Sequence, residues 1–299
     1  MKKRISRSIP TVAAIIKNVL ALFRWQFWGV SIIPVLIGYY MTPHTLDLAR
    51  FVILLVIFGP CLEGGAEAIN DYFDVETDKP ENINKIGIVQ LSGGTGLIQN
   101  GAFAKPTVLV ISLFVYSIGL ILAACFFQVP FVITVIIGIF LGIGYSAPPL
   151  RFKARGLLGP LSVGISFGCL TIFAGFTVNG ILPDTVIILR MLPILLTVTG
   201  LFLTHQIVDY KADLNASVRT FCVRHGIRLT RILSSLLILS GIIAVCILLK
   251  HSSSERFAAI LVLIGLLWIL IALFRDRITT LVRIAAVLLE ATVGILYMI

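Results

Sequence analysis

Nine apolar segments constrain this chain more than any other feature of its sequence. A transmembrane helix needs about 20 mostly apolar residues, and nearly all of these segments reach that length. Hydrophobic residues form 58% of the 299 positions, and the mean hydropathy is +1.05. These values are typical of polytopic membrane proteins. We therefore expect an all-α protein with nine transmembrane helices, over residues 25–41, 51–70, 107–126, 131–145, 158–179, 187–208, 230–249, 257–274 and 279–298.

The basic residues indicate how such a bundle is oriented. If the N-terminus is cytoplasmic, all but four of the 24 Lys and Arg residues fall in cytoplasmic segments, the exceptions being Arg50, Arg190, Lys250 and Arg256. This asymmetry follows the positive-inside rule. Because the net charge of +10 is dispersed over several short segments, it indicates orientation and contact with anionic lipids, and no nucleic-acid partner.

The two ends of the chain differ in character. Residues 1–24 are predicted to form a cytoplasmic amphipathic segment, whose helix over 11–24 lies on the inner leaflet with Lys17 and Arg24 on its polar side. Residues 25–299 are predicted to form a single nine-helix membrane domain. We expect an integral protein of a prokaryotic cell membrane.

A run of acidic residues closes the second apolar segment. Asn70, Asp74 and Asp78 recur at i, i+4 and i+8, so they share one helix face, and we expect Asp71, three residues before Asp74, on the same stripe. Continued backwards, the stripe reaches Glu67 and Glu63 inside the apolar segment. Carboxylates at the edge of a bilayer are costly unless something binds them. Acids at a helix C-terminus also oppose the helix dipole.

A second acidic pair, Asp209 and Asp213, closes the segment 187–208 on the same side of the membrane. His205 and Gln206 lie one turn before it. Two acidic clusters on separate helices repel each other unless divalent cations lie between them. Magnesium ions bound together with a diphosphate are the simplest ligands for such a site. His205 also fits a buried core histidine.

Cationic and glycine-rich segments lie between the two acidic clusters. The turn after the fourth apolar segment carries Arg151, Lys153 and Arg155, which suit the outer oxygens of a diphosphate, although membrane topology alone also explains them. The loop 79–106 adds Lys79, Lys85 and the run 91–96, whose glycines can expose backbone N–H groups to phosphate.

These residues carry a resemblance to a known family. The sequence NDYFDVETD at 70–78 and the sequence DYKAD at 209–213 resemble the two aspartate motifs of the UbiA superfamily of intramembrane prenyltransferases. The segment YSAPPLRFKARG at 145–156 and Thr220 extend the resemblance. It implies a helical bundle around a central cavity, open to the bilayer through a lateral portal. The cavity is expected to bind an isoprenyl diphosphate through two magnesium ions and to transfer the prenyl group to an acceptor, usually aromatic.

The resemblance also assigns roles to single residues. It implies a magnesium and diphosphate set of Asn70, Asp71, Asp74, Asp78, Asp209 and Asp213. Asp71, Asp74, Asp209 and Glu67 are the expected catalytic residues. Substrate contacts are expected from Asn70, Tyr145, Arg151, Lys153, Arg155, Lys79, His205 and Gln206. Many relatives have Asp at the position of Gln206, so metal binding there is expected to rely on Asp209 and Asp213.

The acceptor is less constrained by sequence. The run 90–99 replaces a basic turn found in many relatives and is similar to the branch that prenylates dihydroxynaphthoate in menaquinone synthesis, which favours a quinone precursor. Glu67 fits an acceptor-side role or, equally, a structural pairing with His205 or another polar group. Three other functions stay open, namely a terpene cyclase, prenyl transfer to a non-aromatic acceptor, and an ion-coupled secondary transporter with an acidic site.

Overall fold

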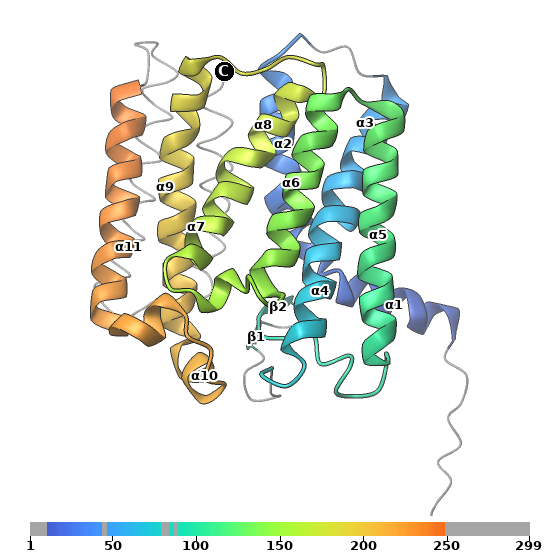
Figure 1. Cartoon of the computed structure of the whole chain (residues 1–299), viewed down its shortest axis with the longest axis vertical. Helices are drawn as coiled ribbons and strands as arrows, with labels where there is room; N and C mark the ends of the chain where they lie inside the picture. The colour runs from blue at the N-terminus through green and yellow to red at the C-terminus, as the bar shows by residue number, and fades with distance from the viewer. Residues whose placement is uncertain (1–10, 44–46, 79–83, 87–88, 249–299) are drawn as a thin grey trace, which may run out of the picture.

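The computed structural model describes residues 11–43, 47–78, 84–86 and 89–248, which form a bundle of roughly parallel and antiparallel helices (Figure 1). The predicted spans at 257–274 and 279–298 lie outside these residues, as does Lys79. The elements in chain order are α1 (Val12–Leu22), η1 (Trp25–Phe27), α2 (Trp28–Tyr40), α3 (Leu48–Val56), η2 (Ile57–Glu63), α4 (Gly64–Asp74), β1 (Asn84–Ile86), β2 (Val89–Ser92), α5 (Lys105–Phe126), α6 (Val129–Ser146), η4 (Phe152–Ala154), α7 (Leu158–Ile165), η5 (Ser166–Leu170), α8 (Thr171–Thr177), α9 (Thr185–Val208), α10 (Tyr210–Asn215) and α11 (Phe221–Leu248).

Several of these helices begin at a side-chain cap. The side-chain oxygens of Thr11, Asp47 and Asp184 accept hydrogen bonds from backbone N–H groups in the first turns of α1, α3 and α9. Such caps satisfy N–H groups that have no partner within the helix. The caps therefore help to fix where these three helices begin.

Five described helical segments are long and apolar enough to cross a membrane, namely Leu48–Asp74, Lys105–Phe126, Val129–Ser146, Leu158–Thr177 and Thr185–Val208. They confirm helices at five of the predicted spans. The pair Val12–Leu22 and Trp25–Tyr40 gives a sixth span if it counts as one. It bends by 44° between Leu22 and Trp25, at the predicted boundary between the N-terminal segment and the span 25–41. The described part of the predicted span 230–249, up to residue 248, falls within α11, which is interrupted at Gly226 with φ 80°. The total of nine spans stays a prediction.

Two of the spanning segments contain a π-helical stretch. The segment Leu48–Asp74 passes through η2, which contains Pro60, and the segment Leu158–Thr177 passes through η5. Proline has no backbone N–H, so the regular i→i−4 pattern cannot continue through it. The π-helical turns η2 and η5 occur where these segments line the interior of the bundle, and such turns are frequent at functional sites.

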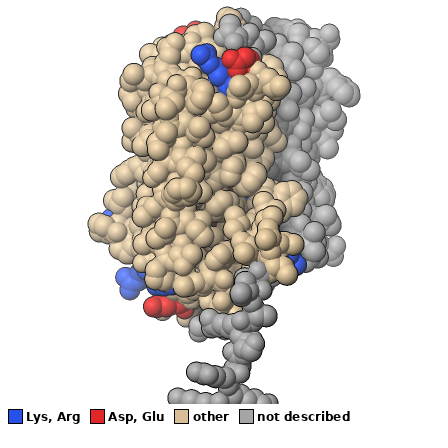
Figure 2. All heavy atoms as spheres, turned by 90° about the vertical axis from the view of Figure 1, so that its right-hand side faces the viewer, with Lys and Arg blue, Asp and Glu red and all other residues tan. Residues whose placement is uncertain are grey.

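The outer surface is apolar over most of its height. Figure 2 shows the visible face almost free of charged side chains except near its two ends. Large apolar residues such as Val110, Phe114 and Phe140 are more than half exposed. In water such a continuous surface would be unstable, whereas in lipid it lies in its preferred solvent. The described bundle is therefore built to be surrounded by lipid.

Small residues allow close helix contacts inside the bundle. A Cβ atom placed on Gly38 of α2 would lie 2.0 Å from the carbonyl oxygen of Ile172, and one on Gly175 of α8 would lie 2.1 Å from that of Val35. The backbones of α2 and α8 thus touch directly, a packing mode common between membrane helices. A larger side chain at either glycine would force the two helices apart.

One end of the bundle gathers the polar connections. The end of α4, the turn after α6, α10 and the strands β1 and β2 all lie at this end (Figure 1). The strands pair antiparallel and form a small addition to a bundle that is otherwise helical, as expected. The reason is local: the segment contains β-favouring Ile86 and Val89, and a short polar connection can satisfy its backbone hydrogen bonds by pairing with itself.

Candidate active site

A cavity of about 430 Å³ lies inside the bundle between η1–α2, η2–α4, α6, α7–η5 and α9. Its interior is apolar, with Phe58, Leu62, Phe167 and Leu201 among the lining residues. Carboxylate, amide and ammonium groups line the end where α4, α9 and the turn after α6 meet. The cavity therefore combines an apolar chamber with a charged mouth, which is how a site for an amphipathic ligand is built.

The end of α4 contributes three of the predicted residues. Asn70, Asp74 and Asp78 line the cavity, as their common helix face requires. Asp74 is only 4% exposed, and its Oδ1 has no hydrogen-bond partner. Burying a carboxylate oxygen without a hydrogen-bond partner costs free energy, so Asp74 Oδ1 is a candidate ligand of a metal ion.

Asp71 does not share that position, which corrects its assignment to the same stripe. It is absent from the cavity lining, and its carboxylate accepts hydrogen bonds from Arg24 and from the backbone and side chain of Thr95. Adjacent helix residues differ by about 100° in direction, so Asp71 points away from the face that carries Asn70. Its contacts are those of a residue that positions other groups.

The second acidic cluster faces the first from α9 and α10. His205, Gln206, Asp209 and Asp213 all line the cavity, together with Thr220 at the start of α11. The side-chain oxygen of Gln206 accepts a hydrogen bond from the backbone N–H of Cys222, at 3.3 Å. The chain thus uses this oxygen to hold α11 against α9, which leaves the aspartates as the acidic groups of this cluster.

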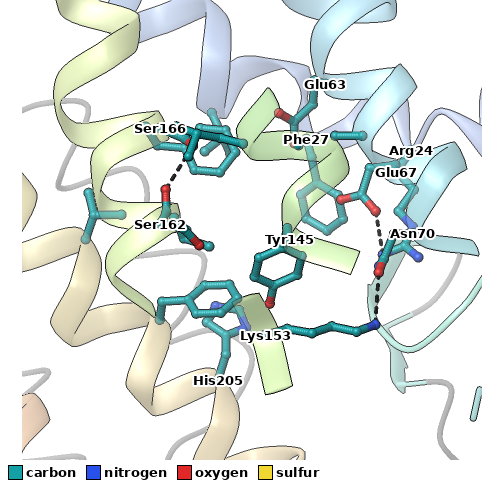
Figure 3. A pocket seen from close by; sticks show the side chains of 18 of the residues that line it. Arg24, Phe27, Glu63, Glu67, Asn70, Tyr145, Lys153, Ser162, Ser166 and His205 are labelled. Carbon is teal, nitrogen blue, oxygen red and sulfur yellow. Dashed lines mark hydrogen bonds and ion pairs between the residues drawn. The ribbon is translucent and has the colours of Figure 1, made fainter. Parts of the chain in front are cut away.

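Of the three cations expected after α6, Lys153 enters the cavity. Its ammonium group lies 3.4 Å from Asn70 Oδ1 (Figure 3) and forms an ion pair with Asp74 Oδ2. Asn70 Oδ1 also accepts a hydrogen bond from Ser146 at 2.7 Å. Arg151 and Arg155 are not among the lining residues, and Arg155 donates to the Pro149 carbonyl at 2.5 Å. Tyr145 lines the cavity next to Lys153, as predicted.

Arg24 lies in the interior, which corrects its predicted place on the polar face of the N-terminal segment. It adopts φ 43° between α1 and η1, is 5% exposed, and its guanidinium lies 2.9 Å from both Glu67 Oε2 and Asp71 Oδ1. The two carboxylates compensate for burial of the charge. Lys17, by contrast, is exposed on α1 as expected. A lone arginine before an apolar segment gave no sequence signal of this role.

The structural pairing expected for Glu67 is present, and its partner is Arg24. Glu67 pairs with Arg24, whereas His205 stacks on the ring of Phe202 with centroids 5.7 Å apart. Glu67 still lines the cavity, so an acceptor-side role stays a proposal. One helical turn deeper, Glu63 accepts a hydrogen bond of 2.6 Å from Ser31, a contact that the sequence did not reveal.

The glycine-rich loop is fastened to α4. Thr95 bonds to Asp71, and Gln99 Nε2 donates to the carbonyls of Val75 and Asp78, each at 3.1 Å. Leu97 is buried in a cluster with Leu22 and Ala68. Residues of the run 90–99 therefore hold the loop against α4. Gly93 is one of the residues that line the cavity.

The charged mouth raises the pKa of two carboxyls. Burial, with the neighbouring Asp74, raises the pKa of Asp78 to about 7, and burial with the neighbouring Asp209 raises that of Asp213 to about 7. Both effects disfavour negative charge. A bound cation would lower both pKa values, so these carboxyls are expected to release protons when a metal binds.

The donor set fits magnesium. The described lining offers carboxylate and amide oxygens, and Asp74 Oδ1 is available without rearrangement. In the described residues no three His, Cys, Asp or Glu side chains converge on one point. Magnesium is commonly held by only one or two carboxylates, with substrate phosphates and water completing the shell. Two facing carboxylate pairs therefore suit magnesium ions bound together with a phosphate-containing ligand.

The fold and this site define a helical membrane protein with an internal apolar cavity and an oxygen-rich, magnesium-compatible mouth. The sequence matches the model of the UbiA prenyltransferase family over residues 31–291, and the chain belongs to this family. The relationship indicated by the aspartate motifs is thereby confirmed at the level of the family.

Individual relatives are more distant. The chain is 28% identical to chlorophyll synthase of Arabidopsis thaliana over 184 residues, which are 55% of this chain and 41% of that protein. It is 27% identical to digeranylgeranylglyceryl phosphate synthase of Sulfurisphaera tokodaii over 70% of this chain and 69% of the relative. The chain thus spans about two fifths of the length of the Arabidopsis protein.

The fold resembles solved structures closely. A UbiA homolog from Archaeoglobus fulgidus bound to GPP and Mg²⁺ gives a TM-score of 0.76 at 16% identity, covering 94% of this chain and 98% of the other. The same homolog bound to DMAPP and Mg²⁺ gives 0.71, covering 93% of this chain and 98% of the other, at 18% identity. At such identity the comparison establishes the fold.

Proposed function

We propose that this protein transfers a prenyl group from an isoprenyl diphosphate to a lipophilic acceptor inside the membrane, with magnesium. The observation that carries the proposal is the meeting of two carboxylate clusters and Lys153 at the mouth of one apolar cavity. An allylic diphosphate has the same division into a polyanionic head and an apolar tail. The archaeal homolog of the same fold was solved with GPP and Mg²⁺, which supports this substrate class.

The residues would divide the work as follows. Asn70, Asp74 and Asp78 on one side and Asp209 and Asp213 on the other would hold the magnesium ions, two in number. Magnesium would neutralise charge on the leaving diphosphate. Lys153 and Tyr145 would contact the same oxygens. Asp71 would act by holding Arg24 and the loop at Thr95, and Arg151 and Arg155 would support the turn that carries Lys153.

The chemistry follows from this placement. The bond between the prenyl C1 and the diphosphate oxygen breaks, the diphosphate leaves with the bonding electrons, and an acceptor atom forms the new bond to C1. The acceptor loses a proton, for which Glu67 is the candidate recipient. The apolar cavity keeps water from the allylic cation.

The chemical class of the acceptor is a separate part of the proposal. The resemblance of residues 90–99 favours an aromatic quinone precursor such as dihydroxynaphthoate. The relative from Sulfurisphaera tokodaii is named for a glyceryl phosphate product, which supports a non-aromatic acceptor as the second candidate. A transporter fits less well, because the four lining aspartates gather at one end of the cavity beside Lys153 and the chain belongs to a prenyltransferase family.

We further propose that the charged mouth and the N-terminus face the cytoplasm, because most basic residues of the sequence belong to connections on that side. The function is tested with purified protein in lipid nanodiscs, supplied with magnesium, prenyl diphosphates of increasing length and a panel of acceptors. Diphosphate release and product masses are measured. Magnesium-dependent release with a prenylated product is expected, and release unaffected by chelation would contradict the proposal.

A further inference from the structure

The turn that carries Lys153 lies against the start of α11, at the same end of the bundle as the charged mouth (Figure 1). A backbone bridge joins Gly156 of this turn to Thr220. We call residues 219–225 the connecting segment. They lie between α10 and Gly226, whose φ of 80° interrupts α11. The connecting segment is thus set apart from the long apolar part of α11.

One side chain, that of Arg224, fastens the connecting segment to the turn. Its Nη2 donates to the Ala154 carbonyl at 2.8 Å, and its Nε donates to the Arg219 carbonyl at 2.9 Å. A Cβ atom placed on Gly156 would lie 3.6 Å from Arg224 Cδ, so the arginine stem passes close to this glycine. We call this pair of hydrogen bonds the Arg224 clamp. A planar guanidinium presents its donors in a fixed geometry, which a lysine cannot reproduce.

Both of the fastened segments reach the charged mouth. Lys153 directly precedes the residue whose carbonyl accepts from Arg224, and its ammonium group forms the buried ion pair at the end of α4. On the other side, Thr220 lines the cavity, and its side chain hydrogen-bonds to that of Asp213. The Arg224 clamp therefore joins the backbone that carries the ammonium group to the backbone beside the second acidic cluster.

The position of the Lys153 ammonium group depends on the position of this backbone. Lys153 is 8% exposed, and ordering a buried lysine side chain costs rotamer entropy. Within the turn, backbone hydrogen bonds of 2.9 Å join Ala154 to Arg151 and Arg155 to Phe152. Such local bonds shape a turn, whereas its placement relative to the second acidic cluster needs contacts from outside the turn. The backbone bridge at Gly156 and the Arg224 clamp supply such contacts.

Arg224 is not placed to bind a ligand in the cavity itself. It is exposed, and it is not among the described residues that line the cavity. Its Nε and Nη2 already donate to backbone carbonyls. Water and salt screen the charge of an exposed side chain. A role for Arg224 through its backbone contacts therefore fits its surroundings better than a direct effect of its charge.

From these contacts we propose that Arg224 is a positioning residue, which holds Lys153 in place for the diphosphate by tying the turn 151–156 to the connecting segment. This inference rests on the proposed prenyl transfer. If Arg224 acts through Lys153, removing both side chains should weaken diphosphate binding little more than removing Lys153 alone. A residue that acted independently of Lys153 would add its own loss of binding free energy.

A double-mutant cycle tests this relation, with binding measured by calorimetry in lipid nanodiscs. The ligand is geranyl S-thiolodiphosphate, an unreactive diphosphate analogue, titrated with magnesium present. We expect Arg224→Met, which keeps an apolar stem but removes the donors, to raise Kd about tenfold, and Lys153→Ala to raise it about 30-fold. The double variant should stay within about threefold of Lys153→Ala. Multiplied effects, about 300-fold in the double variant, would overturn the proposal.

Matched variants separate positioning from charge and from general damage. Arg224→Lys keeps the charge but cannot bridge both carbonyls, so it should raise Kd as Arg224→Met does. Arg228→Met removes an exposed arginine four residues further along α11 and should bind the analogue like the wild type. A wild-type Kd in Arg224→Lys would show that charge alone matters and would overturn the positioning role. If Arg224→Met does not fold, Arg224→Lys replaces it in the cycle.

Failure of the proposed function has a different signature, because the analogue then does not bind to the wild type. Hydrogen exchange of the backbone amides of Ala154 and Arg155, measured without ligand or metal, still tests the clamp. These amides should exchange at least about tenfold faster in Arg224→Met than in the wild type, because the turn opens more often. Arg228→Met should exchange like the wild type. Equal exchange in Arg224→Met and the wild type would overturn the positioning role.

Discussion

Lys153 forms a buried ion pair with Asp74, joining the turn after α6 to the end of α4 across 79 positions of the sequence. The other carboxylate oxygen of Asp74 has no partner. One aspartate thus lies between a fixed ammonium group and an open ligand position. A diphosphate bound with magnesium at this point would meet both charges at once.

Loss of Lys153 should weaken prenyl diphosphate binding. In Lys153→Ala we expect KM for the prenyl diphosphate to rise about 30-fold, equivalent to about 2 kcal/mol, because a charged hydrogen bond is removed. The acceptor KM should change far less. Steady-state kinetics measures both, with Lys17→Ala on the exposed face of α1 as control. Equal increases in both KM values would remove Lys153 from the diphosphate site.

The facing carboxylates should be needed for diphosphate release. Asp74→Asn and Asp209→Asn keep side-chain size but remove negative charge, so we expect release to fall by about 10²-fold or more in each variant. Glu76→Gln should retain wild-type release, because Glu76 is exposed outside the cavity lining. Release is measured with a coupled phosphate assay, and near-normal turnover in either aspartate variant would exclude the assignment.

Magnesium affinity should depend on pH around neutrality. The pKa values of Asp78 and Asp213 are raised to about 7 without metal, so magnesium must displace protons below that pH. Calorimetric titration should show affinity increasing from pH 5 to about 7.5 and then levelling. Asp78→Asn should flatten this dependence, whereas an unchanged slope would show that Asp78 does not take part.

The same shifts predict how stability varies with pH in magnesium-free protein. A carboxyl whose pKa is higher in the folded than in the unfolded chain binds more protons when folded, so its contribution to stability falls as pH rises from about 4 to 7. Replacing Asp78 with Asn should therefore raise the unfolding temperature at pH 8 more than at pH 5. Thermal unfolding followed by intrinsic fluorescence measures the difference.

Asp71 should act as a positioning residue. Asp71→Asn removes one of the two carboxylates that compensate for Arg24, and we expect a loss of about 2–4 kcal/mol in unfolding free energy. Thr95→Val should lose about 1 kcal/mol, because it removes a hydroxyl but keeps the backbone bond. Denaturant unfolding compares the two variants. Wild-type stability in Asp71→Asn, accompanied by lost magnesium binding, would return Asp71 to the metal ligands.

The proposed orientation is tested by labelling from one side of the membrane. Lys211 on α10 and Leu182 on the loop before α9 are exposed and lie beyond opposite ends of α9. Each is replaced by cysteine in a background without native cysteines. In intact cells, an impermeant maleimide should label position 182 and leave position 211 unlabelled. The reverse pattern would invert the topology.

The sequence alone determined the features that depend on local pattern. Long apolar runs specify membrane helices, since a backbone in lipid must satisfy its hydrogen bonds internally. The i, i+4, i+8 spacing put Asn70, Asp74 and Asp78 on one face, because helix geometry fixes that relation within a few residues. The same rule places Asp71 off that face, because it is adjacent to Asn70 and adjacent helix residues differ by about 100° in direction.

Only the tertiary structure decided which groups meet across the bundle. Arg24 pairs with carboxylates more than 40 positions away, Ser31 reaches Glu63, and Lys153 enters the cavity while Arg151 and Arg155 do not line it. No periodicity encodes such contacts, because they depend on how separate helices pack and on which way a turn aims its side chain. The charged motifs thus follow from spacing along one helix, whereas the meeting of the two carboxylate clusters and Lys153 around one cavity follows from the packing of several helices.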